Sequence, residues 1–148
     1  MDHNIERRYY VERIADFVRG LESQASDLRF IDENRVVFRA KGRPFETLAW
    51  IDEEHDLICI TTRTSELPES KFDDAVKIMQ LALQTCWNHC VAVSPADKHY
   101  ELSMALFVGG FTFEAFEAVV FNLLACAESI ELSFVDQKEA GKQDVGEG

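Results

Sequence analysis

Two short segments contain residue types that could bind a metal or transfer protons. In the first, Cys86, His89 and Cys90 stand close together in the sequence Cys-Trp-Asn-His-Cys. On a helix, Cys86 and Cys90 lie one turn apart on the same face, as two metal ligands would require. A structural zinc site needs four ligands, and no second Cys/His pair stands at a suitable spacing. The spacing is also one residue too long for a redox Cys-x-x-Cys motif, so we expect buried structural thiols.

The second segment, 52–56, has the sequence Asp-Glu-Glu-His-Asp and places carboxylates beside an imidazole. Such groups act as general acids and bases, or as ligands for a cation. The segment lacks the ligand spacing of an EF-hand loop, and it separates two strand-like runs. We therefore interpret the stretch from Asp52 to Asp56 as a solvated hairpin turn.

No recognised catalytic motif stands elsewhere in the sequence. The pair Gly109-Gly110 lacks the Lys and Ser/Thr that follow the glycines of a phosphate-binding loop. A nucleophile elbow of the type Gly-x-Ser-x-Gly is also absent. The sequence therefore predicts a protein that is not an enzyme and that uses no metal and no cofactor. The alternative is a small enzyme or metal-binding protein that uses Cys86, His89 and Cys90 or the acidic segment 52–56.

Composition limits the partners that this chain could have. The 148 residues carry a net charge of −12, and 47% of them are hydrophobic. Nucleic acids and anionic membrane surfaces both attract clustered Lys and Arg, so neither is expected as a partner. The sequence contains no run of about eighteen apolar residues that could cross a bilayer. The polar start, which does not resemble a signal peptide, and the four cysteines in apolar contexts lead us to expect a cytoplasmic protein.

Apolar periodicity predicts the elements that position these segments. Residues 9–21 show helical spacing, and 70–90 form a longer helical run with Ser70 as its N-cap. After the break at Gly109-Gly110, Thr112 is the expected N-cap of a third helix that ends near Glu128. Strand-like runs lie at 36–40, 45–51, 57–62, 91–93 and 99–107, with Phe30-Ile31 as a candidate short leading strand.

Together these elements predict an α+β fold in which an antiparallel sheet packs with helices, in the order α-β-β-β-α-β-β-α. We expect a single domain over residues 1–135, in which residues 130–135 form a last strand or an extended tail. Residues 136–148 are polar and contain glycines, so they are predicted to be a disordered acidic and polar tail.

One predicted strand carries large apolar side chains on both faces. Phe45, Thr47, Ala49 and Ile51 alternate with Leu48 and Trp50. If the first set faces the helices, Leu48 and Trp50 face outward, where large apolar residues tend to mark an interface. A shift of one residue in register would exchange the two faces, and a neighbouring segment could cover the outer one.

The second half of the chain resembles the YbjN-like family and the type III secretion chaperones that share its fold. The features that carry the resemblance are a long helix, the strand Val91-Ala92-Val93, a second strand over 100–107, the break at Gly109-Gly110 and a helix start in Thr-x-Glu form. With the element order, the resemblance covers residues 9–128. The family more often has Asn or Asp and a Phe-rich strand after the central helix, and this sequence departs from that pattern.

The resemblance implies a non-catalytic, cytoplasmic bacterial protein that forms a homodimer and binds a protein partner of unknown identity. Proteins of this kind are secretion chaperones, which hold extended segments of an effector, or regulators of sensory transduction and stress behaviour. In such a dimer, the wide apolar stripe that contains Ile78, Leu81 and Trp87 is the candidate interface. A purely structural subunit of a larger assembly is a further alternative.

Overall fold

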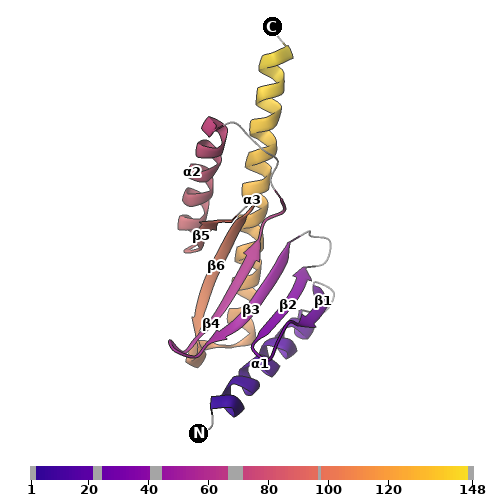
Figure 1. Cartoon of the computed structure of the whole chain (residues 1–148), viewed down its shortest axis with the longest axis vertical. Helices are drawn as coiled ribbons and strands as arrows, with labels where there is room; N and C mark the ends of the chain where they lie inside the picture. The colour runs from indigo at the N-terminus through magenta and orange to yellow at the C-terminus, as the bar shows by residue number, and fades with distance from the viewer. Residues whose placement is uncertain (1–2, 22–24, 41–44, 67–71, 97, 147–148) are drawn as a thin grey trace.

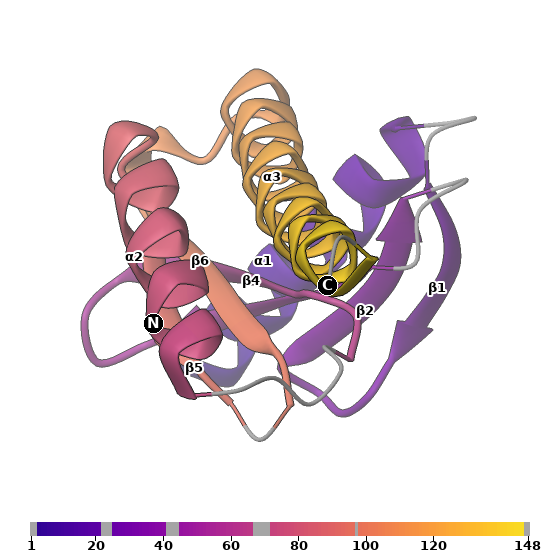
Figure 2. The same ribbon diagram turned by 90° about the horizontal axis from the view of Figure 1, so that it is seen from above.

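The computed structural model describes residues 3–21, 25–40, 45–66, 72–96 and 98–146. Within these ranges the chain forms a six-stranded antiparallel sheet with the strand order β1-β2-β3-β4-β6-β5. Three α-helices pack on one face of the sheet (Figures 1 and 2), which leaves the other face without a covering helix among the described residues. The elements in chain order are α1 (His3–Gly20), β1 (Ala25–Phe30), β2 (Arg35–Ala40), β3 (Glu46–Asp52), β4 (Leu57–Arg63), α2 (Phe72–Asn88), β5 (Ala92–Pro95), β6 (Tyr100–Phe107), the 3₁₀ turn η2 (Val108–Gly110) and α3 (Phe113–Gly146).

The sheet alternates between buried and accessible side chains, as the period of two requires. In β4, for example, Ile58 and Ile60 are fully buried beneath the helices, whereas Cys59 is only half-buried on the opposite face. A central group of phenylalanines joins α1, α3 and the sheet. Phe17, Phe38, Phe111 and Phe116 stack with ring centroids 4.9–6.1 Å apart. Burial of this group on the helix side contributes to packing of the layers, together with the aliphatic residues of the core.

The third helix begins where the sequence predicts it. The Oγ1 atom of Thr112 accepts a 3.2 Å hydrogen bond from the backbone N–H of Ala115, so Thr112 is the N-cap. The expected N-cap at Ser70 lies outside the described residues. Helix α2 and helix α3 lie side by side (Figure 2), and the Asn122 amide on α3 donates a 3.0 Å hydrogen bond to the carbonyl of His89. This contact holds the C-terminal end of α2 against α3.

The predicted fold class is confirmed, with two differences in the elements. The leading strand is a full element, β1, which pairs with β2, so the observed order is α-β-β-β-β-α-β-β-α. Residues 130–135 are helical rather than extended, because α3 continues from Phe113 to Gly146. Ile130 is 1% exposed and belongs to the core, which explains why the alternation of this stretch was misleading. The helical assignment runs into the segment 136–146, for which the composition predicts a disordered tail.

Candidate protein-binding surface

Leu48 and Trp50 lie on the open face of the sheet, opposite the helices. Phe45, Thr47 and Ala49 are 0–1% exposed and face the core, so the alternation of β3 places Leu48 and Trp50 on the other side. Both side chains are half-buried. The sequence left open which face of this strand is covered, and the structure settles it: the two candidate binding residues stand on the face that the helices leave uncovered.

Strand pairing brings further residues beside these two. Val37 on β2 and Thr61 on β4 flank Leu48, while Arg35 and Cys59 flank Trp50. Leu48, Trp50, Val37 and Thr61 contribute to a groove of about 260 Å³ that Ile31 and three charged side chains complete. The lining residues are Ile31, Val37, Glu46, Leu48, Trp50, Thr61, Arg63 and Glu101. We call this feature the Trp50 groove.

Charged side chains form one rim of the Trp50 groove. Arg63 on β4 donates to the Glu101 carboxylate on β6 at 2.8 and 3.0 Å. Glu46 on β3 lies 3.5 Å from Arg29 and 3.7 Å from Arg39. These exposed pairs stabilise the sheet only weakly, since solvent screens them. Their effect on the groove is to occupy both carboxylates of the rim. Of the apolar residues that line it, Ile31 is exposed, Leu48 and Trp50 are half-buried and Val37 is buried.

The sequence alone did not identify the other residues of the groove. Ile31, Val37 and Arg63 come from three different segments, and no spacing within one strand connects them to Trp50. Only the pairing of β2, β3 and β4 places them together. A signal for Val37 was present in the alternation of β2, where Val36 and Phe38 face the core and Val37 faces the open side.

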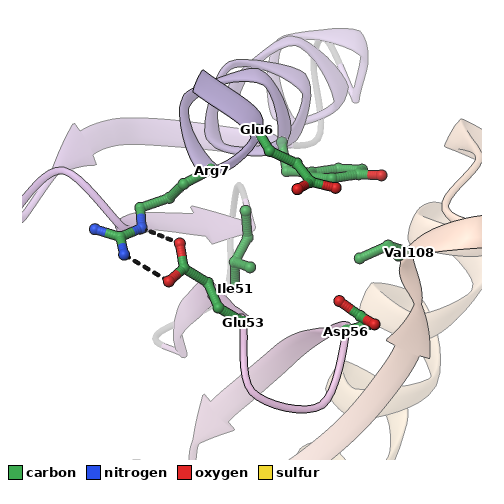
Figure 3. Close-up of a pocket in the computed structure, with 7 residues that line it drawn as sticks. Glu6, Arg7, Ile51, Glu53, Asp56 and Val108 are labelled. Atoms are coloured by element: carbon green, nitrogen blue, oxygen red, sulfur yellow. Dashed lines mark hydrogen bonds and ion pairs between the residues drawn. The ribbon is translucent and has the colours of Figure 1, made fainter. Parts of the chain in front are cut away.

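A second, smaller cavity lies between α1 and the turn that joins β3 to β4 (Figure 3). Its volume is about 70 Å³, which accommodates roughly two water molecules and is far below a typical ligand pocket of about 300 Å³ or more. Arg7 reaches from α1 to Glu53 and forms a double hydrogen bond with its carboxylate, the second at 2.6 Å. This contact joins the start of α1 to the turn. We therefore interpret the cavity as a gap beside a structural ion pair and not as a ligand site.

The acidic segment 52–56 forms the expected exposed turn between β3 and β4. The Asp52 carboxylate accepts a 3.1 Å hydrogen bond from the backbone N–H of Glu54, and its other oxygen lies 2.9 Å from Nδ1 of His55. The hydrogen bond with His55 and the backbone N–H groups lower the pKa of Asp52 below its ordinary range. Asp52, Glu54 and His55 each offer a ligand atom within 4.8 Å of the others, but Glu54 and His55 are exposed, and the half-buried Asp52 carboxylate is engaged with His55 and the backbone of the turn.

The cysteine segment does not form a metal site. Cys86 is fully buried, and burial beside Cys126 raises the pKa of its thiol to about 12. Helix α2 ends at Asn88, so Cys90 lies beyond it, is exposed and does not share a helix face with Cys86. The expectation that these cysteines are buried structural thiols is therefore right for Cys86 and wrong for Cys90. His89 is exposed as well.

The candidate dimer residues on α2 separate onto different sides of the helix. Ile78 is 3% exposed and belongs to the core, which places it away from any exposed interface. Leu81 and Trp87 are 38% and 82% exposed. Val76 and Leu83, which were not in the predicted interface, are also exposed and share a helix face with Trp87, from which they stand eleven and four residues away. We call Val76, Leu83 and Trp87 the α2 stripe.

Among the described residues, no helix combines the length and the apolar character needed to cross a lipid bilayer.

No protein-family model and no curated protein sequence matches this chain. Solved structures do resemble it. An uncharacterized protein from Methanothermobacter thermautotrophicus has a TM-score of 0.69 and 13% identity, over 85% of this chain and 96% of that one. A chain of the HopA1–SchA chaperone–effector complex has a TM-score of 0.62 and 15% identity, over 86% and 95%. A chain of the ExsC–ExsE complex has a TM-score of 0.53 and 18% identity, over 86% and 92%.

These similarities establish the fold alone. Identities of 13–18% do not assign a function to this chain. The chain shares its fold with chains of the HopA1–SchA and ExsC–ExsE complexes, which confirms the chaperone-like fold expected from the resemblance. Membership of the YbjN-like family is not tested by any of these structures and stays a prediction.

Proposed function

We propose that this chain is a non-catalytic, chaperone-like protein that holds an extended segment of a protein partner on the open face of its sheet. The observation that carries the proposal is the Trp50 groove, a partly accessible groove with an apolar floor on a sheet face that no described helix covers. Large apolar residues in such a position favour binding of another protein. The chaperone-like fold, found in the HopA1–SchA chaperone–effector complex, supports the same role.

The net charge of −12 fits this role in a second way. A strongly charged protein stays soluble while it exposes apolar surface, and it keeps a bound apolar segment in solution. We place this activity in the cytoplasm, as expected for a chaperone-like protein that meets its partner before delivery. The identity of the partner decides between a secretion chaperone and a regulator of signalling.

The proposal includes a homodimer. The α2 stripe gives it a candidate interface, because Trp87 is 82% exposed and large aromatic residues are enriched where protein surfaces meet. The stripe lies on α2, whereas the Trp50 groove lies on the open sheet face, so self-association would leave the groove accessible.

A comparison of two charge-insertion variants tests the binding role. Tagged wild-type protein, Leu48→Glu and Leu132→Glu are used to capture partners from a lysate of the native host, read by mass spectrometry. Leu48 lies in the groove, whereas Leu132 is 64% exposed on α3 and serves as the matched control. We expect wild type and Leu132→Glu to retain one dominant partner at near-stoichiometric yield, and Leu48→Glu to lose it.

Circular dichroism melts of each variant accompany this capture. Loss of the partner by a Leu48→Glu protein that melts like wild type supports the open face as the binding site. Equal capture of the dominant partner by all three proteins contradicts the proposal.

A further inference from the structure

The Trp50 groove has the dimensions of a pocket for one large side chain. Its volume of about 260 Å³ exceeds the roughly 150 Å³ of an apolar cavity that holds a benzene molecule. It is nonetheless below the range of about 300–1,000 Å³ that is typical of pockets for whole small molecules. The groove therefore matches a single bulky group that belongs to a longer chain, rather than a free metabolite.

The floor of the groove is apolar and includes an aromatic ring. Ile31, Val37, Leu48 and Trp50 are its apolar lining residues on the open face. Aromatic rings that meet in offset or edge-to-face geometry attract one another beyond the effect of buried area alone. An aromatic side chain thus gains more from this floor than an aliphatic side chain of similar size.

The charges at the rim disfavour a cationic ligand. The charged residues that line the groove are Arg63 and two carboxylates, those of Glu46 and Glu101. Arg29 and Arg39 lie outside the lining and pair with Glu46. Both carboxylates are already engaged in ion pairs with these arginines. A lysine or arginine side chain placed over the Trp50 ring would have to compete with them, although the whole chain is strongly acidic.

We infer that the Trp50 groove is an anchor pocket for one aromatic side chain of the bound partner segment. This inference rests on the proposed function, and it adds which residue type the partner must present. It predicts that the partner segment carries a Phe, Tyr or Trp at the position that meets β3, and that a basic residue there is not an equivalent substitute.

Titration of the native chain with three blocked amino acids tests the inference. The probes are N-acetyl-L-phenylalaninamide, N-acetyl-L-leucinamide and N-acetyl-L-lysinamide, and the readout is the tryptophan indole N–H region of a two-dimensional ¹H–¹⁵N NMR spectrum. The chain has two tryptophans, Trp50 and Trp87, so the spectrum contains an internal control. Trp87 lies on α2 and is highly exposed. The variants Trp50→Phe and Trp87→Phe assign the two signals.

We expect the phenylalanine amide to shift the Trp50 signal saturably and to leave the Trp87 signal in place. The leucine amide should bind about 2- to 10-fold more weakly, which is the contribution of an aromatic pair expressed as an affinity ratio. The lysine amide should cause no saturable shift. Phe107→Glu, which changes an open-face residue outside the groove, should preserve the response, and Leu48→Glu should remove it.

Three results would overturn the inference: no shift at Trp50, equal shifts at both tryptophans, or binding of the lysine amide as tight as that of the phenylalanine amide. The wild-type titration decides the matter even if Leu48→Glu does not fold. If partner capture depends on Leu48 while the three amides bind alike, the anchor fails and the proposed function stands. If the phenylalanine amide binds selectively while Leu48→Glu captures the partner normally, the proposed function fails and the pocket stands.

Discussion

The backbone N–H of Val91 donates a 2.7 Å hydrogen bond to the carbonyl of Cys86, and this contact closes the C-terminal end of α2. A second bond joins the N–H of Cys90 to the carbonyl of Trp87 at 3.0 Å. Cys90 adopts a φ of 58°, in the left-handed region. The arrangement is a Schellman motif in which a cysteine occupies the position that usually holds glycine.

Replacement of Cys90 by glycine should therefore stabilise the protein. A left-handed conformation costs a residue with a Cβ about 1–2 kcal/mol, and glycine avoids that strain at some cost in unfolded-chain entropy. We expect a net gain of about 0.5–1 kcal/mol in the free energy of unfolding, measured by urea denaturation. Cys90→Val is the matched control and should destabilise, since a β-branched residue tolerates positive φ poorly. A Cys90→Gly protein less stable than wild type would contradict this account.

A pair of buried hydroxyls gives a second prediction. Thr47 and Thr62 pair across β3 and β4 on the core side, both fully buried, with their Oγ1 atoms 2.9 Å apart. Thr47→Val should cost about 1–3 kcal/mol, because it leaves the Thr62 hydroxyl buried without a partner. The double variant with Thr62→Val removes both polar groups and should recover most of that loss. Urea denaturation of the four members of this cycle measures the coupling, and additive losses would refute it.

The buried thiol of Cys86 makes stability depend on pH at the alkaline end. Burial raises the pKa of this thiol from 9.0 to about 12. Above about pH 9 the unfolded chain loses the Cys86 proton while the folded chain keeps it, so the free energy of unfolding falls as pH rises. The stabilising contribution is complete below that pH.

Comparison with Cys86→Ala isolates the effect, since other groups titrate in both proteins. Urea denaturation at about pH 8 and about pH 10.5 should show a smaller loss of stability in Cys86→Ala than in wild type. Equal losses in the two proteins would show that the Cys86 thiol does not ionise differently in the folded and unfolded chains.

The α2 stripe yields a prediction about self-association. A glutamate in place of Trp87 would bury a charge in any interface formed by this face, so Trp87→Glu should weaken the dimer at least tenfold. Sedimentation equilibrium at several protein concentrations measures the change, with Leu132→Glu as a matched control on α3. A wild-type chain that sediments as a monomer throughout would exclude the dimer. Dissociation by Leu132→Glu alone would move the interface to α3.

Local sequence signals were sufficient wherever one element decides the outcome. The alternation through Thr47, Leu48 and Ala49 predicted that Leu48 lies on the opposite face of β3 from its two neighbours, because successive side chains of a strand point to opposite faces. Which of the two faces is covered depended on the packing of the helices. The cap at Thr112 followed from one side chain and its neighbours along the chain. Helical periodicity alone could not tell which apolar side of α2 meets the core, so Ile78 was placed at an interface although it is buried.

The amino-acid sequence by itself determined the class of fold, the acidic character and the alternation that puts Leu48 and Trp50 on the same face of their strand, since these depend on composition and on periodicity within single elements. Only the tertiary structure decided that Ile31, Val37 and Arg63 join them in one groove. It also decided that α2 ends between Cys86 and Cys90, and that residues 130–135 extend a helix. The physical reason is that cross-strand pairing and packing between layers join residues distant in sequence. No local pattern records those contacts.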